Sequence, residues 1–233
     1  MRKSLTSIRP LAALDDKLRQ RIYLLVRSEG RPVTREEVAR EVGISRKLAA
    51  FHLDKLLERG LLDAHYARPP GRSGPGAGRS SKMYRPSELE LQVLIPERRY
   101  DLLGELLVEA IEHPEPGESA HDAAIRAAAD RGRALGDDIR RREGLRPPGA
   151  ERALSVTASI LEEHGFEPYR NGSDEIALRN CPFRTLATGS PELVCEMNQA
   201  FVEGLVRGLG NERVEAVLTR RPGDCCVSLR APT

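Results

Sequence analysis

Apolar and polar positions follow a helical period over much of the N-terminal third of the chain. Residues 14–28 carry apolar side chains at helical spacing, and residues 33–62, VTREEVAREVGISRKLAAFHLDKLLERGLL, predict two further helices joined by a tight turn. Thr34 can cap the first of these helices, with Glu37 as its capping-box partner. Gly43 supplies the left-handed residue of the turn, and Ser45 can cap the second helix. The pattern therefore predicts a helix-turn-helix.

The second of these helices divides into a core side and an exposed side. Its exposed residues, together with the cap Ser45, form a short basic edge: Arg46, Lys47, Ala50 and His52. Arg or Lys at the start of such a helix can pair with guanine edges or phosphates, and a small residue lets the helix approach the major groove closely. We rank His52 below the two basic residues, because a histidine on a helix flank is more often a packing or phosphate-contacting group.

A Gly-, Pro- and Arg-rich stretch follows, between two short apolar runs expected to be strands at 61–67 and 82–85. This arrangement is typical of a wing, which would place basic side chains on phosphates or in the minor groove: Arg68, Arg72, Arg79 and Lys82. No G-x-x-x-x-G-K-[ST] spacing occurs, which excludes a phosphate-binding P-loop. A flexible linker fits the composition but not the position directly after a helix-turn-helix.

Charge separates this basic module from the rest of the chain. Residues 1–85 hold 19 Lys and Arg against 9 Asp and Glu, a formal charge of +10, whereas the remainder carries −8. A basic module joined to an acidic one is expected when only the first contacts nucleic acid, although a solvated basic face would look the same.

The whole pattern predicts an α+β protein with three regions. Residues 1–87 form a winged helix-turn-helix DNA-binding domain, residues 88–145 a strand and helical connector, and residues 146–233 a C-terminal α+β sensor domain. In the connector we expect a strand at 89–95 and helices at 97–112 and 121–142. One of the two apolar helix stripes is expected to pair with its copy in a homodimer. The last region predicts, in order, a helix at 150–164, strands at 166–170 and 174–179, a helix at 191–209, and strands at 213–219 and 225–230.

All four cysteines lie in this last region: Cys181, Cys195, Cys225 and Cys226. No C-x-x-C spacing occurs, which argues against a thioredoxin-like pair and a zinc ribbon. Alternation along the last strand predicts Cys225 on its inner face and Cys226 on the opposite face. Three cysteines that are distant in sequence suit an iron–sulfur cluster better than a closed zinc site. The alternative is that all four are small buried core residues.

The stretch VAREVGISRKLAAFHLDKLLERGLL, with the Gly-rich wing and KMYR, resembles the winged-helix bacterial regulators of the ArsR and DeoR type. NCPF, PELVCEMN and GDCCV resemble the C-terminal cysteine pattern of the SufR group, repressors that carry an iron–sulfur cluster on three cysteines. The resemblance implies Cys181 and Cys195 as ligands and Cys225 as the third. The doubled cysteine departs from that pattern and leaves Cys226 as the other candidate.

Together these features predict a homodimeric transcriptional regulator that binds a double-stranded DNA operator and senses a signal through a cysteine-bound iron–sulfur cluster. One alternative replaces the cluster with an organic-ligand pocket in the C-terminal domain, and another makes Cys195 the nucleophile of an enzyme. We expect no enzymatic activity, because no histidine has a readable place beside Cys195 and no cofactor fingerprint occurs. The short apolar run near the N-terminus predicts neither a signal peptide nor a membrane span, so we expect a cytoplasmic protein.

Overall fold

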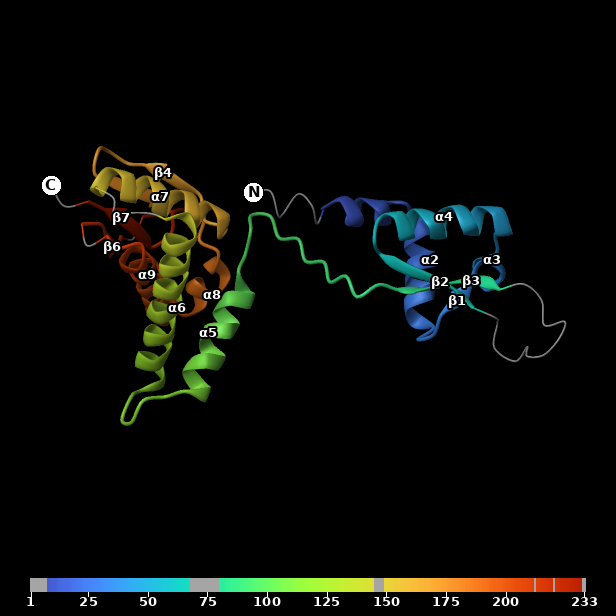
Figure 1. Cartoon of the computed structure of the whole chain (residues 1–233), viewed down its shortest axis with the longest axis horizontal. Helices are drawn as coiled ribbons and strands as arrows, with labels where there is room; N and C mark the ends of the chain where they lie inside the picture. Colours follow the sequence, from blue (N-terminus) through green and yellow to red (C-terminus); the bar gives the residue numbers. More distant parts are fainter. Residues whose placement is uncertain (1–7, 68–79, 145–148, 212, 220, 232–233) are drawn as a thin grey trace. The chain divides into compact units, whose positions relative to one another are not determined.

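The computed structural model describes the chain except for residues 1–7, 68–79, 145–148, 212, 220 and 232–233 (Figure 1). Its contacts divide the chain into two compact units, residues 2–93 and 94–233. Each unit has its own hydrophobic core.

The N-terminal unit combines helices with a small antiparallel sheet. Its helical elements are η1 (Ala13–Asp15), α2 (Lys17–Ser28), α3 (Arg35–Val42) and α4 (Arg46–Glu58). Its strands are β1 (Val33–Thr34), β2 (Leu62–Ala67) and β3 (Ser81–Pro86), hydrogen-bonded in the order β1-β3-β2. Helices α3 and α4 and the β2–β3 pair lie where the sequence predicts a helix-turn-helix and a wing.

Local signals set the ends of these helices. Thr34 and Glu37 form the expected capping box of α3, and Gly43 adopts a left-handed conformation with φ 76° at its C-terminus. The Ser45 side chain accepts a hydrogen bond from the backbone N–H of Leu48 at the start of α4. All three predicted end signals are confirmed, and together they fix where α4 begins.

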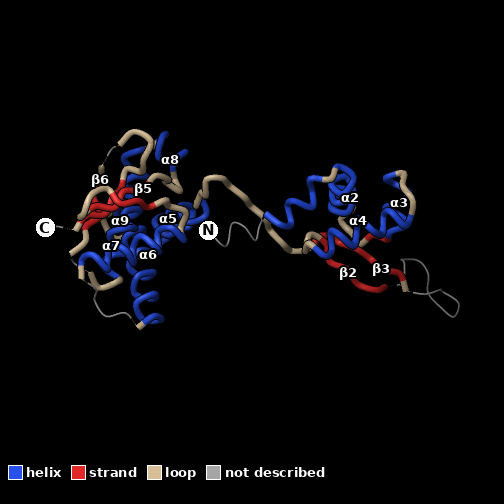
Figure 2. The backbone as a smooth tube through the Cα atoms, turned by 90° about the horizontal axis from the view of Figure 1, so that it is seen from above, coloured by secondary structure: helices blue, strands red, loops and turns tan. Residues whose placement is uncertain are grey.

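The C-terminal unit packs helices against a second sheet. The helices are α5 (Tyr100–Glu112), α6 (Ala120–Glu143), α7 (Ala150–Glu163), α8 (Arg184–Gly189) and α9 (Pro191–Gly208). The strands are β4 (Pro168–Arg170), β5 (Glu175–Leu178), β6 (Glu215–Leu218) and β7 (Val227–Arg230), in the antiparallel order β4-β5-β7-β6 (Figure 2). The combination of helices with antiparallel sheets fits the predicted α+β class.

Helices α6 and α9 lie side by side along much of their length (Figure 1). Glycines spaced four apart line both sides of the contact: Gly132 and Gly136 on α6, and Gly204 and Gly208 on α9. A β-carbon on any of the four would collide with backbone atoms of the facing helix. Small residues at this spacing let the two backbones approach closely, so this pair forms the centre of the unit.

One prediction for the connector is wrong. Residues 88–99 form no strand, because the alternating residues 89–95 have no neighbouring strand to pair with. Leu91 packs instead against the N-terminal core, while Ile95 is 82% exposed. In α5, Leu103 is 3% exposed and packs into the same core as α6 and α9, so the pairing of one helix stripe with its copy in a second subunit stays a prediction.

Candidate nucleic-acid interface and cysteine cluster

Helix α4 presents a basic N-terminal end. Its core side holds Ala49, His52, Leu53 and Leu56, which are all buried. Arg46 and Lys47 are exposed and Ala50 is half-buried. At 100° per residue Lys47 lies almost opposite the centre of the core side, and Arg46 lies on its flank. These two side chains are therefore placed to meet a surface that covers the start of the helix.

His52 requires a correction. Its side chain is 6% exposed, because it lies on the core side of α4, and it stacks edge to face with Phe51 at 5.2 Å between ring centroids. We therefore assign His52 to packing and not to DNA contact. The residue that the sequence reading missed is Phe51, which is 53% exposed on the outer face. The sequence does contain a signal for this exposure: Phe51 lies one helical turn after Lys47, so the two residues share one face of α4.

The wing strands hold Lys82 against α4. Its ammonium nitrogen lies 2.6 Å from Oδ1 of Asp54, which also accepts a hydrogen bond from the Tyr84 hydroxyl at 3.1 Å. Burial disfavours the charged amine, but the hydrogen bond to Asp54 and the interactions with Tyr84 and the Asp54 charge together outweigh burial and raise the Lys82 pKa. Lys82 thus fastens β3 to α4, and a phosphate contact from it stays a prediction. Three other predicted wing contacts lie outside the described residues: Arg68, Arg72 and Arg79.

Cys181 and Cys225 meet in the interior of the C-terminal unit. Cys181 follows β5 and is 4% exposed, and Cys225 precedes β7 and is 3% exposed. The backbone N–H of Cys225 donates to the Leu178 carbonyl at 2.7 Å, which aligns the two segments. A hydrogen bond joins the two thiols. Because β5 and β7 are neighbours in the sheet, residues 44 positions apart come into contact.

The two thiols differ in acidity. The hydrogen bond from Cys225 lowers the pKa of Cys181; burial opposes this effect, and the Phe183 backbone N–H supports it. The pKa of Cys225 is raised by its bonds to Cys181 and Cys226 and by burial. Cys181 is therefore the thiol of this pair that ionises first, with Cys225 as the donor.

Cys226 does not point away from Cys225 as predicted. Strand β7 begins at Val227, so the pair precedes the strand and the alternation of side chains does not apply to it. Cys226 is half-buried, and its thiol forms a hydrogen bond with that of Cys225. Three thiols are thus in one place: Cys181, Cys225 and Cys226, called the cysteine cluster below.

Helix α9 adds an amide to this cluster. The Asn198 side chain is 1% exposed, and its Nδ2 donates to the Cys225 sulfur at 3.2 Å. Its Oδ1 is buried and has no hydrogen-bond partner among the described residues. Cys195, which is half-buried, precedes Asn198 by three residues and so lies on the same side of α9. The sequence reading missed Asn198 because its role depends on a contact with a distant loop.

Two polar residues next to these cysteines in the sequence, Asn180 and Asp224, have other partners. Asn180 donates to the carbonyls of Gly165 and Glu97 at 2.6 and 3.1 Å, which uses both amide hydrogens. Asp224 accepts a hydrogen bond from the Tyr169 hydroxyl at 2.6 Å. In the part of the chain that the structure describes, no three His, Cys, Asp or Glu side chains are arranged to hold a metal ion. Thiolates are ligands that iron and zinc both take in proteins, and binding either metal here would require the hydrogen bonds between the thiols to break.

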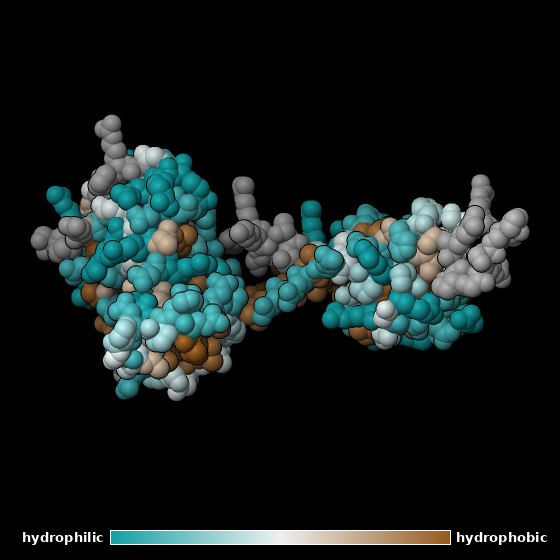
Figure 3. All heavy atoms as spheres, turned by 60° about the horizontal axis from the view of Figure 1, so that its bottom comes forward, coloured by the Kyte–Doolittle hydropathy of each residue, from teal (hydrophilic) through white to brown (hydrophobic). Residues whose placement is uncertain are grey.

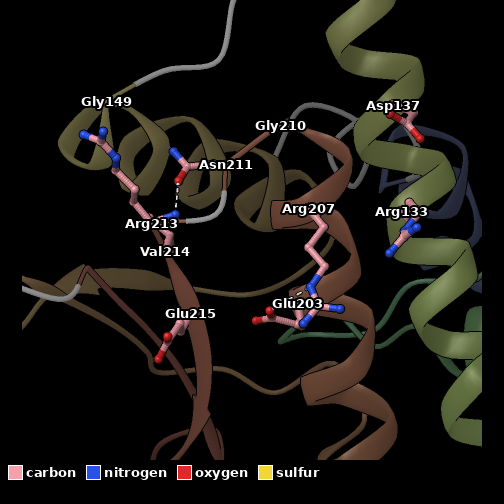
Figure 4. Close-up of a pocket in the computed structure, with 10 residues that line it drawn as sticks. All are labelled: Arg133, Asp137, Gly149, Glu203, Arg207, Gly210, Asn211, Arg213, Val214 and Glu215. Atoms are coloured by element: carbon pink, nitrogen blue, oxygen red, sulfur yellow. Dashed lines mark hydrogen bonds and ion pairs between the residues drawn. The ribbon is translucent and has the colours of Figure 1, made fainter.

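A separate polar pocket of about 1010 Å³ lies between α6, α9 and the segment leading into β6 (Figure 4). Arg133 and Arg207 line it from the two helices, and Arg213 lines it from the segment before β6. Glu203 pairs with Arg207 at 3.1 Å, whereas Arg133 and Arg213 form no ion pair with any described residue. Asp137, Glu203 and Glu215 line the same pocket, so an anionic ligand would have to be held at the guanidinium groups of Arg133 and Arg213.

Comparison with known proteins identifies the N-terminal unit. Residues 14–64 match a family model described as a helix-turn-helix domain. In transcriptional regulators this class of domain places its second helix in the major groove of DNA, and α4 holds the corresponding position in this chain. A search of curated proteins finds no match to this chain. No helix in the described residues is long and apolar enough to cross a membrane.

Proposed function

We propose that this chain is a winged helix-turn-helix transcriptional regulator that recognises an operator through α4 and controls this binding from its C-terminal unit. The observation that carries the DNA-binding part is the match of residues 14–64 to a helix-turn-helix domain whose second helix exposes Arg46 and Lys47. The +10 charge of residues 1–85 supports it, because phosphate contacts supply most non-specific affinity.

Alanine at both Arg46 and Lys47 tests this assignment. Each base-directed contact is worth about 1 to 3 kcal/mol, so the double variant should lose specific binding to a duplex selected from a random pool. Fluorescence anisotropy with the full chain provides the measurement. The matched control replaces Arg131 and Arg142, two exposed arginines of α6 in the other unit, and should bind normally. Undiminished specific binding by the Arg46 and Lys47 variant would contradict the assignment of α4.

We further propose that the cysteines of the C-terminal unit hold an iron–sulfur cluster, with Cys181, Cys195 and either Cys225 or Cys226 as ligands. Contact among Cys181, Cys225 and Cys226 supports the inner part of this set, and Cys195 is included because it lies on the same side of α9 as Asn198, whose amide donates to the Cys225 sulfur. Binding would require the hydrogen-bonded thiols to separate. The cluster would supply redox or iron-dependent chemistry, while the chain's own residues exclude water from the site and hold the sulfurs.

Iron and acid-labile sulfide in protein prepared without oxygen test the cluster. Serine at Cys181, Cys195 or Cys225 should remove both, because the loss of one ligand exposes iron to solvent. Serine at Cys226 shows which member of the doubled cysteine is the third ligand. Thermal unfolding of each apo-variant separates ligand loss from misfolding. A wild-type protein without iron, with four variants that behave alike, would contradict the proposal.

The polar pocket favours a second candidate, in which a small anion replaces the cluster as the signal. Among the described residues, Arg133 and Arg213 form no ion pair with a carboxylate, and both line this pocket. Citrate titrated into the full chain should then release heat in the wild type and none in an Arg133→Ala variant. Citrate that neither releases heat nor shifts DNA affinity would rule out this class of signal.

We also propose that the regulator acts as a homodimer, because regulators of this type bind two-fold operators. The exposed apolar residues of α5 are Val108 and Ile111, at 53% and 75%. Figure 3 shows apolar side chains gathered on the part of the C-terminal unit that comes forward in that view. Sedimentation velocity of the full chain measures the assembly state, and a monomer at operator-binding concentrations would contradict the dimer.

A further inference from the structure

An exposed aromatic ring stands at the middle of the outer face of α4. Phe51 is 53% exposed and Leu48 beside it is 39% exposed. Lys47 precedes Phe51 by four residues and Asp54 follows it by three, so all three share one face of the helix. This face points away from the core residues Ala49 and Leu53 and so is open to a partner.

Contacts with its neighbours hold the ring in place. Phe51 packs edge to face on the buried His52 ring, at an interplanar angle of 77°. One turn further along, the Asp54 carboxylate is paired with Lys82 and accepts the Tyr84 hydroxyl. Neutralising Asp54 removes a charge that would repel phosphates next to the ring. The face therefore offers cations at its start, an apolar ring in its middle and a neutralised carboxylate at its end.

We infer that Phe51 reads thymine by contacting its C5-methyl group in the major groove, and that it is a specificity-determining residue of the proposed DNA-binding function. A recognition helix enters the major groove with its N-terminal residues, and among base edges only thymine presents an apolar group there. Lys47, one turn earlier, can pair with a guanine edge beside that thymine. The inference rests on DNA binding by α4 and adds which base feature the ring recognises.

Replacing single thymines by deoxyuridine provides the test, because this change removes only the methyl group. The duplex is first selected from a random pool by the full-length wild type, and each thymine is then substituted in turn. At one or two positions the wild type should bind about fourfold more weakly, the value of one buried methyl group. The Phe51→Ala variant should bind the thymine and deoxyuridine duplexes equally at those positions.

Two further variants keep the result interpretable. Phe51→Leu retains an apolar side chain and should keep part of the preference for thymine. Leu24→Ala removes an apolar residue of α2 with 55% exposure and should leave the deoxyuridine profile unchanged. Circular dichroism of Phe51→Ala checks that α4 remains folded.

The possible failures are distinct. Equal sensitivity to deoxyuridine in the wild type and Phe51→Ala, or no sensitive thymine at all, overturns the inference and leaves DNA binding by α4 intact. A Phe51→Ala variant that changes its assembly state with unchanged sequence preference also overturns it, and makes the ring a protein contact. Failure of the wild type to enrich any duplex removes the proposed function and the inference together.

Discussion

At the scale of single residues, the buried carboxylate of Glu175 shows how charge stabilises the C-terminal unit. Glu175 begins β5 and is 6% exposed. It accepts hydrogen bonds from Arg221 at 2.7 Å, Asn171 at 2.6 Å and Ser228 at 2.8 Å. Burial opposes its charge, but these bonds outweigh burial and lower its pKa from 4.5 to about 2. The ionised form is therefore the one that stabilises the fold.

This lowered pKa predicts an acid-sensitive unit. A group whose pKa is lower in the folded state contributes stability above its unfolded value, and that contribution is lost as the pH falls from about 4.5 towards 2. Glu175→Gln should lower the free energy of unfolding near pH 7 by on the order of 2 kcal/mol, the value of hydrogen bonds to a charged group. Urea unfolding at several pH values measures this.

The variant should also unfold with a weaker dependence on pH between 4.5 and 2 than the wild type. Glu88→Gln, at an exposed carboxylate of the N-terminal unit, is the control and should leave stability unchanged. If Glu175→Gln shows wild-type stability and wild-type acid sensitivity, the carboxylate is not the stabilising group.

At the scale of elements, the close contact of α6 with α9 depends on glycine. A β-carbon at Gly204 would meet the Ala129 backbone carbonyl, which cannot move aside as a flexible side chain could. Gly204→Ala should therefore lower stability by about 1 to 3 kcal/mol or more, the usual cost of overpacking. Thermal or denaturant unfolding of the full chain measures the loss.

Gly104 on α5 is the matched control for this prediction. It also lies within a helix, but a β-carbon there would have nothing within 4 Å. Gly104→Ala should raise stability by up to about 1 kcal/mol, because alanine has the better helix propensity. If the two alanine variants had the same effect, close backbone approach would not be the reason for glycine at Gly204.

The same elements show which features a sequence can predict. The boundaries of α3 and α4 depend on contacts within one helical turn, made by Thr34, Glu37, Gly43 and Ser45, and these were predicted correctly. The strand at 89–95 was wrong because a strand needs a partner that alternation does not specify. Helix α8 was missed, since its six residues RTLATG are too short to show a period.

The candidate sites follow the same rule. The spacing of apolar residues predicted the exposed basic residues at the start of α4. It did not predict the burial of His52 or the exposure of Phe51, because both depend on the angle at which α4 packs on α2 and α3. The sequence alone shows that all four cysteines lie in the C-terminal region. The contact of Cys226 with Cys225 could not be predicted from the sequence. It depends on β7 beginning at Val227, two residues after the start of the predicted strand at 225–230.

At the scale of the whole molecule, the chain joins a helix-turn-helix unit to an α+β unit with its own core. The segments predicted as a separate connector, α5 and α6, share that core with α9 and with the cysteine cluster. A change at the cysteines therefore acts on the unit that contains α5 and α6. Regulation requires that this unit alter either assembly or the placement of α4 on DNA.

The central claim is that α4 gives this chain sequence-specific affinity for DNA. The most direct test is the ratio of two dissociation constants of the full-length protein at fixed, physiological salt, for a duplex selected from a random pool and for the same duplex scrambled. A specific regulator should prefer the selected duplex by about 10³-fold or more. Equal affinity for both duplexes, with the same dependence on salt, would contradict the claim and reduce the basic unit to a non-specific polyanion contact.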